Sequence, residues 1–278
     1  SGQQLPILLG NLPNVVSYSE DGAGYGATAL FIRGNDTYRT NVTINGIPYN
    51  DAESQGVFFY NLSDFASSAE NIQLQRGVGT STNGAGAFGA SLNILSDASS
   101  EKPYAQIANY LGSYMTHKHA IKFSTGKLKE HFELAGRFSK INSDGYIDRA
   151  SSDLKSYFLQ GAYSNNNTLI KGLVFGGTEK TYLTYKGISA EQLQKDRRYN
   201  PAGKYTVGGQ TFFYDNETDN YQQDHAQLHW TQKWDEHWNT NLSLHYTKGK
   251  GYWEQMDNWG DSKGNFVIRY QLDHDFYG

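Results

Sequence analysis

Cysteine is absent from the 278-residue chain, which excludes a disulfide-stapled scaffold and any metal site built on thiolates. Proline is scarce, with 5 residues, whereas glycine reaches 30 and tyrosine 21. That balance favours strands and tight turns over long helices. No apolar run approaches the roughly 20 residues of a membrane-spanning helix. Basic residues do not exceed acidic ones, 24 against 28, and they are scattered singly, so the sequence argues against nucleic-acid binding.

Three glycines in the stretch NGAGAFGASLNI, Gly84, Gly86 and Gly89, match the G-x-G-x-x-G spacing of dinucleotide-binding loops. Such a loop opens a helix and is followed about 20 residues later by an acidic residue that binds the ribose. Here turn-forming residues and Pro103 follow instead of an amphipathic helix, and residues 104–112 contain no carboxylate. We therefore interpret the three glycines as structural turn residues, and we expect no cofactor.

The first 98 residues alternate short strand patterns with long polar loops. Strand patterns occupy residues 29–33, 41–44, 72–76 and 91–95. Asn45-Gly46 is a type I′ hairpin signal, because both turn positions require positive φ. The stretches LPILLGNLPNVV and LSDFASSAENI each predict a short helix, the second with Ser63 as its N-cap. The sequence therefore predicts a compact α+β domain over residues 1–98.

From residue 104 onward, strand-length segments alternate strictly between apolar and polar side chains. The pattern occupies residues 105–111, 120–124, 131–140, 156–163, 168–175, 224–234 and 241–248, and the final GNFVIRYQLDHDFYG indicates an eighth strand. Most segments are near the roughly 9–11 residues of a tilted strand that crosses a bilayer. Short turns alternate with longer polar loops at residues 142–155, at 178–223 and from 249 onward, which is typical of an outer-membrane barrel. A soluble carbohydrate-binding β-sandwich remains the alternative, because sandwich strands alternate as well.

Candidate catalytic and metal-binding groups are few. His117 and His119 share one strand face, as do His225 and His229, but neither pair has a third ligand at a fixed spacing, so no metal site is expected. The acidic pairs lie in turn-rich sequence without the context of a glycosidase dyad, and no G-x-S-x-G is present. We therefore expect that the chain is not an enzyme, and a polysaccharide-degrading activity is a remote third hypothesis.

Aromatic residues gather in the stretch KGKGYWEQMDNWG, which is predicted to be a long loop. Tyr252, Trp253 and Trp259 form this group. An exposed aromatic cluster needs a physical reason, and contact with a ligand is one. The second possible reason is that the rings pack against one another within the loop. The sequence does not decide between the two.

The segments LPNVV, LFIRGND, VTINGIPYND and AENIQLQRGVGTSTNGAGAFGASLNILS resemble, in this order, the signature segments of the plug in a TonB-dependent outer-membrane receptor. The last segment is similar to the family pattern R-G-x-x-S-x-x-G-x-x-A-x-G-G-x-[IL]-N-I, with Thr80 at the serine position and Ala90 at the second glycine position. In the plug the resemblance rests on many matching signature residues, whereas in the barrel it rests mainly on the alternating strand pattern.

The resemblance implies a fold class and a domain division. An α+β plug domain at residues 1–98 would be followed at residues 99–278 by the N-terminal portion of an antiparallel transmembrane β-barrel. The barrel would be incomplete, with seven or eight of about 22 strands. We therefore expect the chain to be a fragment of a longer receptor.

The resemblance also implies a function, import of a scarce nutrient across the outer membrane of a Gram-negative bacterium by energy-coupled rearrangement of the plug. The nutrient would be a ferric siderophore or a similar chelate. Further expected partners are outer-membrane lipid and a TonB-type energy-coupling protein, which would bind a segment missing from this chain. The arginines of the two RG signatures, Arg33 and Arg76, are implied to anchor the plug to carboxylates on the barrel interior.

Six residues in three apical plug loops are implied to face the ligand: Asp21, Tyr25, Tyr38, Arg39, Glu53 and Gln55. Arginine and tyrosine suit an anionic chelate. The carboxylates among the six are less easily explained by such a ligand.

Overall fold

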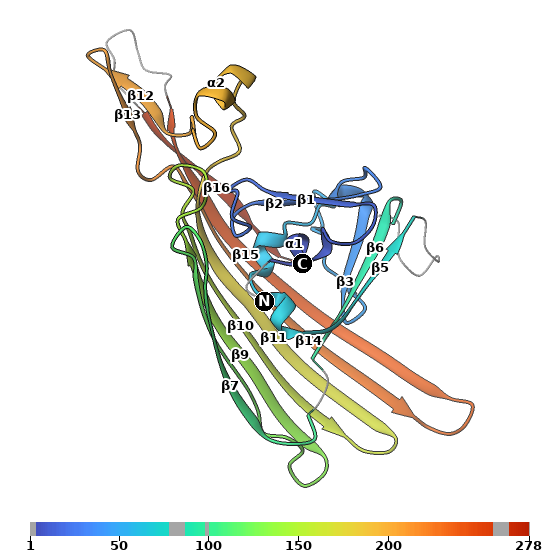
Figure 1. Ribbon diagram of the computed structural model, residues 1–278. Helices are drawn as coiled ribbons and strands as arrows, with labels where there is room; N and C mark the ends of the chain where they lie inside the picture. Colours follow the sequence, from blue (N-terminus) through green and yellow to red (C-terminus); the bar gives the residue numbers. More distant parts are fainter. Residues whose placement is uncertain (1–3, 78–86, 98–99, 258–266, 278) are drawn as a thin grey trace.

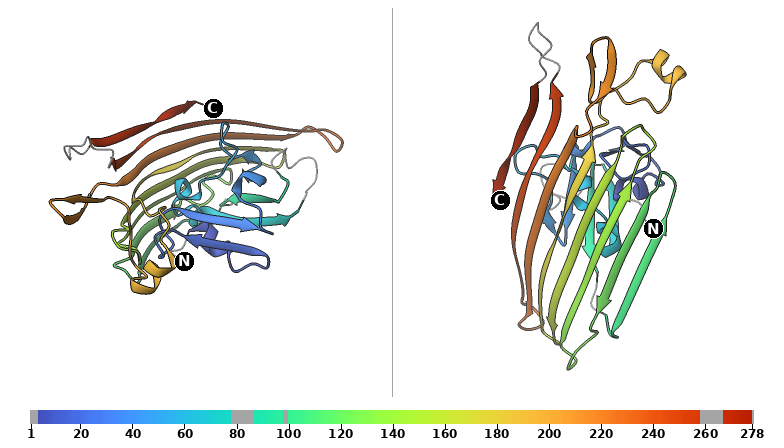
Figure 2. Two further views of the ribbon diagram at one scale, coloured as in Figure 1. Left: turned by 90° about the horizontal axis from the view of Figure 1, so that it is seen from above. Right: turned by 90° about the vertical axis from the view of Figure 1, so that its left-hand side faces the viewer.

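A small mixed domain lies against the concave face of one long curved sheet (Figure 1, Figure 2). The computed structural model describes residues 4–77, 87–97, 100–257 and 267–277, and side chains up to residue 256. The small domain is built from α1 (Leu5–Leu9), β1 (Val15–Ser19), β2 (Thr28–Ile32), η1 (Thr37–Arg39), β3 (Thr40–Ile44), β4 (Ile47–Pro48), η2 (Phe59–Leu62), η3 (Phe65–Ser68), β5 (Ala69–Arg76) and β6 (Ala90–Ser96).

The small domain has a four-stranded sheet in the order β4-β3-β6-β5 and a separate β1-β2 hairpin. The four predicted strands are confirmed as β2, β3, β5 and β6, whereas β1 was not predicted. Asn45 and Gly46 have φ of 54° and 81°, which confirms the predicted hairpin turn. The predicted helix near Ser63 is a short 3-10 helix, and its N-cap is Asp64 rather than Ser63.

The long sheet has eight antiparallel strands, and their order in the sheet is their order in the sequence. They are β7 (Tyr104–Leu111), β8 (His117–Ser124), β9 (Phe132–Ser143), β10 (Ser152–Ser164), β11 (Thr168–Tyr182), β14 (Thr218–Lys233), β15 (Asn239–Asp257) and β16 (Val267–Tyr277). All seven predicted strands are therefore confirmed, together with the eighth. Because these eight strands form one sheet rather than two stacked layers, the sandwich alternative loses its support.

The two faces of the long sheet meet different surroundings. In β9 the exposed side chains are those of Phe132, Leu134, Phe138 and Lys140, and the side chains between them are mostly buried. The buried face of β10 and β11 contributes Phe158 and Phe175 to the core cluster of the small domain. Their rings lie 6.3 and 5.0 Å from the ring of Phe65 in η3. The small domain thus covers the inward face, and an apolar outward face is left exposed.

Strands continue into stretches that the sequence predicted as loops. Of residues 142–155 only 144–151 connect strands, and the predicted loop at 178–223 is strand up to Tyr182 and again from Thr218. The connection between them holds α2 (Ala190–Lys195) and the hairpin of β12 (Lys204–Val207) and β13 (Gln210–Phe213). In these continuations, residues 176–182 and 218–223, polar side chains fall on both faces of the sheet. The apolar period therefore disappears although the backbone ladder continues. Among the described residues, no helix combines the length and the apolar character that a bilayer crossing requires.

Candidate functional site

A cleft opens between the upper loops of the small domain and the inner wall of the long sheet. Its volume is about 310 Å³. We call it the apical cleft, and its lining consists of Tyr49, Asp51, Glu53, Ser54, Gly56, Phe58, Tyr60, Asn61, Asp219, Tyr221 and Gln223. A second hollow of about 420 Å³ adjoins it and shares Phe58, Tyr60 and Asp219. Both hollows are lined by residues of β14 and of the segment around η2, so segments far apart in the sequence form one surface.

The two-residue period of a β-strand determines which side chains of the long sheet line the apical cleft. Asp219, Tyr221 and Gln223 alternate along β14 and therefore point to the same face of the sheet. Tyr221 lies against Gly249 and Gly251 of the neighbouring strand, because an added Cβ would come within 2.2 Å of its hydroxyl and 2.4 Å of its ring. The two glycines of β15 thus leave room for this tyrosine beside the cleft.

The small-domain side of the cleft is a tight loop after β4. Asp51 Oδ1 accepts hydrogen bonds from the backbone N–H of Glu53 at 3.1 Å and of Ser54 at 2.6 Å. The Tyr49 hydroxyl donates to Gln223 Oε1 at 2.9 Å, which ties the loop to β14. Burial raises the pKa of Tyr49 well above its usual value, so this hydroxyl stays a neutral donor.

Four of the six predicted ligand-facing residues are exposed in the upper loops of the small domain. Glu53 lines the apical cleft, and the exposed Gln55 is close by in the same loop with φ of 60°. Tyr38 lines the adjoining hollow and is 51% exposed. Arg39 pairs with Asp36 at 2.9 Å on the surface. The structure therefore places Glu53 and Tyr38 in the lining of the two hollows, and Gln55 and Arg39 outside that lining.

Asp21 and Tyr25, the other two, are buried at 2% and 4% exposure. Asp21 accepts backbone N–H groups from Ala23, Gly24 and Tyr25 at 2.9–3.2 Å, so its carboxylate holds its own loop together. Tyr25 packs in a small core, and burial raises the pKa of its hydroxyl to about 12. Neither side chain is available to a ligand in this structure.

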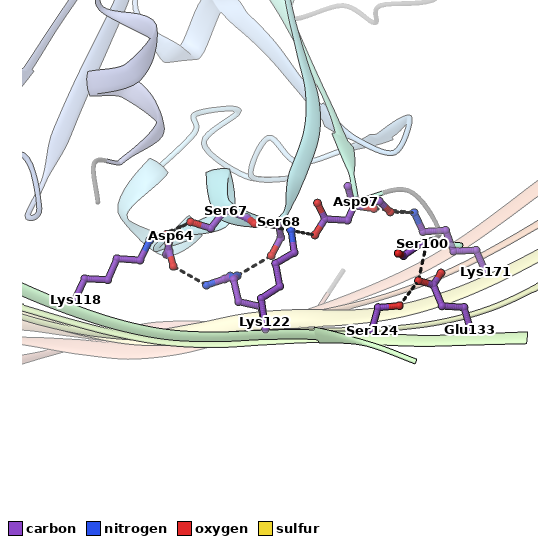
Figure 3. A network of polar contacts seen from close by, with 12 residues as sticks. Asp64, Ser67, Ser68, Asp97, Ser100, Lys118, Lys122, Ser124, Glu133 and Lys171 are labelled. Carbon is purple, nitrogen blue, oxygen red and sulfur yellow. Dashed lines mark hydrogen bonds and ion pairs between the residues drawn. The ribbon is translucent and has the colours of Figure 1, made fainter. Parts of the chain in front are cut away.

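A buried ionic cluster joins the small domain to the long sheet (Figure 3). Asp64 Oδ2 accepts from Arg137 Nη1 at 2.9 Å, and Asp64 Oδ1 pairs with Lys118 Nζ. Ser67 Oγ donates to Asp64 at 2.6 Å, and Arg137 Nε donates to Ser68 Oγ at 2.7 Å. We call these five residues the latch. Burial would raise the pKa of Asp64, but Arg137 and Lys118 hold it below its ordinary value.

A second set of polar contacts lies beside the latch at the end of β6 (Figure 3). Lys122 Nζ pairs with Asp97 at 2.6 Å, and Lys171 Nζ donates to the Asp97 carbonyl at 3.3 Å. Glu133 Oε1 accepts from the Ser100 N–H at 2.8 Å and from Ser124 Oγ at 2.6 Å. In the latch and at Asp97, the small domain supplies the carboxylates and the sheet supplies the cations. The anchoring expected of Arg33 and Arg76 has the opposite signs, with the cations on the small domain and the carboxylates on the sheet.

The two predicted anchoring arginines make other contacts. Arg76 Nη1 donates to the Pro13 carbonyl at 2.9 Å, within the small domain. Arg33 is exposed with φ of 52°. In the described part of the chain no ion pair involves either arginine. Their anchoring to barrel carboxylates remains a prediction.

Some of the remaining predicted site residues lie in the part of the chain that the structure describes, and others lie outside it. Gly89 allows the backbone to lie close to the side chain of Asn35, since an added Cβ would be 2.6 Å from Asn35 Cβ. Gly84, Gly86 and Trp259 lie outside the described residues. The prediction that Tyr252 and Trp253 lie in a loop is wrong, because both are in β15. Trp253 pairs with Asp219 and shares its face, whereas Tyr252 is on the opposite face.

The latch was missed by sequence reasoning. The alternation in β9 does place Arg137 and Glu133 on the polar face of the strand. A signal was therefore present, since charged side chains in the middle of a strand need partners when that face is covered. The partner, Asp64, lies 73 residues earlier in the chain, and no pattern links the two.

Residues 2–91 match the family model described as the TonB-dependent Receptor Plug Domain. This part of the chain is a TonB-dependent receptor plug domain. The whole chain is similar in structure to the siderophore receptor PirA from Acinetobacter baumannii, with a TM-score of 0.65 and 13% identity over 100% of this chain and 41% of PirA. No curated protein matches the chain.

Two other solved structures show the same likeness. The pyoverdine outer membrane receptor FpvA from Pseudomonas aeruginosa PAO1 gives a TM-score of 0.68 at 12% identity, over 98% of this chain and 39% of FpvA. The ferric-catecholate import receptor Fiu from E. coli K12 gives 0.66 at 14%, over 97% and 42%. The chain thus spans less than half the length of these receptors. At such identities the likeness establishes the fold, which confirms the predicted plug domain followed by antiparallel barrel strands.

Proposed function

We propose that the chain is the N-terminal part of an outer-membrane receptor that imports a scarce nutrient, with the plug at residues 1–98 and barrel strands at 99–278. The boundary at residue 98 lies outside the described residues. The observation that carries the proposal is the seating of a plug domain on the inward face of a sheet whose outward face is apolar. A soluble protein would have to cover such an outward face.

The outward face has the composition that lipid favours. Its exposed apolar side chains come from successive strands and include Ile121, Phe132, Leu134, Phe138, Ile170, Val174, Leu228, Leu242, Leu244 and Tyr246. These side chains are 40–55% exposed. We infer that this band faces the outer-membrane bilayer of a Gram-negative cell.

The contacts between plug and wall suit a domain that rearranges. Around the latch and Asp97 they are polar and charged, so water can replace them when the plug moves. Ligand would bind at the two hollows, through Glu53 and Tyr38, which line them, and through the neighbouring Gln55 and Arg39. A TonB-type energy-coupling protein would then act on the plug through a segment outside this chain. Arg33 and Arg76 would anchor the plug to carboxylates on strands outside this chain.

The expected nutrient is a ferric siderophore or a similar chelate. The similarity to receptors described as siderophore, pyoverdine and ferric-catecholate receptors supports this ligand class. The receptor itself requires no cofactor for this function, because the chelate is its cargo.

Membrane fractionation of cells that express the complete receptor tests the proposal. The receptor should be recovered in the outer-membrane fraction and require detergent for extraction. Uptake of a radioactive ferric chelate should depend on both the receptor and the coupling protein. Recovery in the soluble fraction would contradict the proposal.

A further inference from the structure

A groove of about 600 Å³ lies on the outward face of the long sheet. Its apolar side chains include Ile121 and Phe138, which are 50% and 49% exposed. Tyr157 of β10 bounds the groove and donates a hydrogen bond to Asp224 Oδ1 of β14 at 2.8 Å. This hydrogen bond crosses Gly176 of β11, so the Tyr157 ring is directed away from Phe138 of β9 and leaves the groove open.

Two lysine side chains border the groove. Lys140 follows Phe138 by two residues in β9, and Lys155 precedes Tyr157 by two residues in β10, so all four share the outward face. Both lysines line the groove and lie directly opposite one another in the β9-β10 ladder. The groove therefore combines an apolar part with two adjacent ammonium groups.

The positive charge of these two lysines is only weakly balanced. Like charges directly opposite in a β-ladder repel one another. Lys140 Nζ lies 3.8 Å from Asp153 Oδ2, but the pair is exposed and contributes little in water. In the described ranges no ion pair involves Lys155. An anion bound between the two ammonium groups would replace their repulsion by two attractions.

The lysines continue across the sheet in one row. Successive ladder partners in this row are Lys140, Lys155, Thr178, Gln222 and Lys250. Lys250 is thus three strand spacings from Lys155, or roughly 14 Å. A headgroup that carries two well-separated phosphates can reach both lysines, whereas a headgroup with one phosphodiester reaches only one of them. The row therefore suits a headgroup with two separated phosphates.

The row lies at the end of the sheet where the apical cleft opens. Its member Gln222 lies between Tyr221 and Gln223 in β14, and these two residues line the apical cleft from the opposite face of the sheet. The connection with α2 and the β12-β13 hairpin leaves the sheet at the same end (Figure 1). In the proposed receptor this end faces the cell exterior, so the row lies at the headgroup level of the outer leaflet.

We propose that this groove binds a phosphorylated glycolipid of the outer leaflet, with one headgroup phosphate between Lys140 and Lys155. An acyl chain of the same lipid lies on Ile121 and Phe138. The inference rests on the proposed membrane location and adds a lipid site to it. Lysine binds phosphate as a point charge, and basic residues beside an apolar membrane surface favour anionic headgroups. A soluble phosphate would contact the lysines but not the apolar side chains, so it fits only half of the groove.

Titration of the complete receptor in detergent, followed by native mass spectrometry, tests the inference with three lipids. The first is diphosphorylated lipid A, and the second is the same lipid A with both phosphates removed. The third is cardiolipin, a phospholipid whose two phosphates are close together. The diphosphorylated lipid A should bind at least tenfold more tightly than the dephosphorylated form, and more tightly than cardiolipin. Inorganic phosphate at the same concentration should not displace it.

Two substitutions locate the phosphate in the groove. Lys140→Met and Lys155→Met each remove a charge and keep most of the unbranched side chain. Each should weaken binding of the diphosphorylated lipid A about tenfold, the order expected for one charged hydrogen bond. Neither should change binding of the dephosphorylated form.

Lys195→Met is the matched control, because Lys195 is exposed in α2, pairs with Glu191 and does not line the groove. It removes the same charge and should leave the affinity for every lipid unchanged. Circular dichroism of each variant checks that the fold is intact.

The outcomes separate this inference from the import proposal. Equal affinity for the two forms of lipid A, or binding of cardiolipin as tight as that of the diphosphorylated form, would overturn the glycolipid site. Unchanged affinity in both groove variants would overturn its location. Each of these leaves the membrane location and the uptake assay untouched. Recovery of the receptor in the soluble fraction would instead overturn the import function, whatever the lipids do.

Discussion

Asp64→Asn is the substitution that tests the plug contacts most sharply. Asp64 has φ of 55°, a left-handed conformation that asparagine tolerates as well as aspartate does. The substitution therefore removes the charge without adding backbone strain. Lys118 and Arg137, which are 5% and 1% exposed, would then be buried without their counter-ion.

The expected loss is large because both partners are buried. Breaking a buried ion pair by removing one partner costs about 3–5 kcal/mol. At the lower bound, plug opening becomes roughly 150-fold more frequent, since each 1.4 kcal/mol is about tenfold. The β7–β16 ladder itself does not include Asp64, so the loss should fall on plug docking rather than on the sheet.

Hydrogen–deuterium exchange of the complete receptor measures this opening. The backbone N–H of Ser67 and of Asp97 report it, because they bond to the carbonyls of Asp64 and Ser68 at 3.1 and 2.9 Å. Both should exchange about 150-fold faster in Asp64→Asn. Asp36→Asn, which removes the same charge from an exposed pair, should change exchange less than about fivefold. Equal effects of the two substitutions would refute the view that the latch holds the plug.

Three further outcomes follow from Asp64, from Gly89 and from the outward face of the sheet. The pKa of Asp64 is lower in the folded state than in the unfolded state. Its charge therefore stabilises the folded plug fully above the ordinary aspartate pKa of about 3.9, and this stabilisation is lost as the pH falls through the lower folded value. Exchange at the plug should thus accelerate on acidification below about pH 4, and Asp64→Asn should remove that acceleration. Gly89→Ala should destabilise the plug by about 1–3 kcal/mol, because the new methyl group would clash with Asn35 and the Arg39 carbonyl. Thermal unfolding measures this loss, and an unchanged Tm would contradict the close approach. Phe138→Arg, on the outward face, should cost about 2–4 kcal/mol in refolding into lipid vesicles, and a neutral result would contradict lipid contact.

The architecture was predictable from the sequence because its causes are local. Period-two alternation identified strands such as β10, whose inward side chains are buried against the plug while the outward ones are not. The Asn45-Gly46 turn followed from the positive φ that both positions require. The order of the plug segments carried the family resemblance without reference to packing.

The strand ends and the site residues were not predictable to the same degree. Trp253 was placed in a loop because β15 loses its apolar period there, although backbone hydrogen bonds extend the strand to Asp257. Asp21 resembled an exposed loop carboxylate, but the burial of its side chain depends on the backbone path around it. The latch joins residues 54 and 73 positions apart, so only the folded chain brings them together.

The orientation of the long sheet can be measured directly by spin labelling along β14 in lipid vesicles. The chain has no cysteine, so each introduced cysteine is its single labelling site. Nitroxides at Leu228 and Trp230 should be accessible to oxygen dissolved in lipid and shielded from a water-soluble nickel chelate. Those at Gln227 and His229, which face the plug, should be shielded from both. Loss of this alternation, or access of the nickel chelate to Leu228, would contradict a sheet with lipid on one side and the plug on the other.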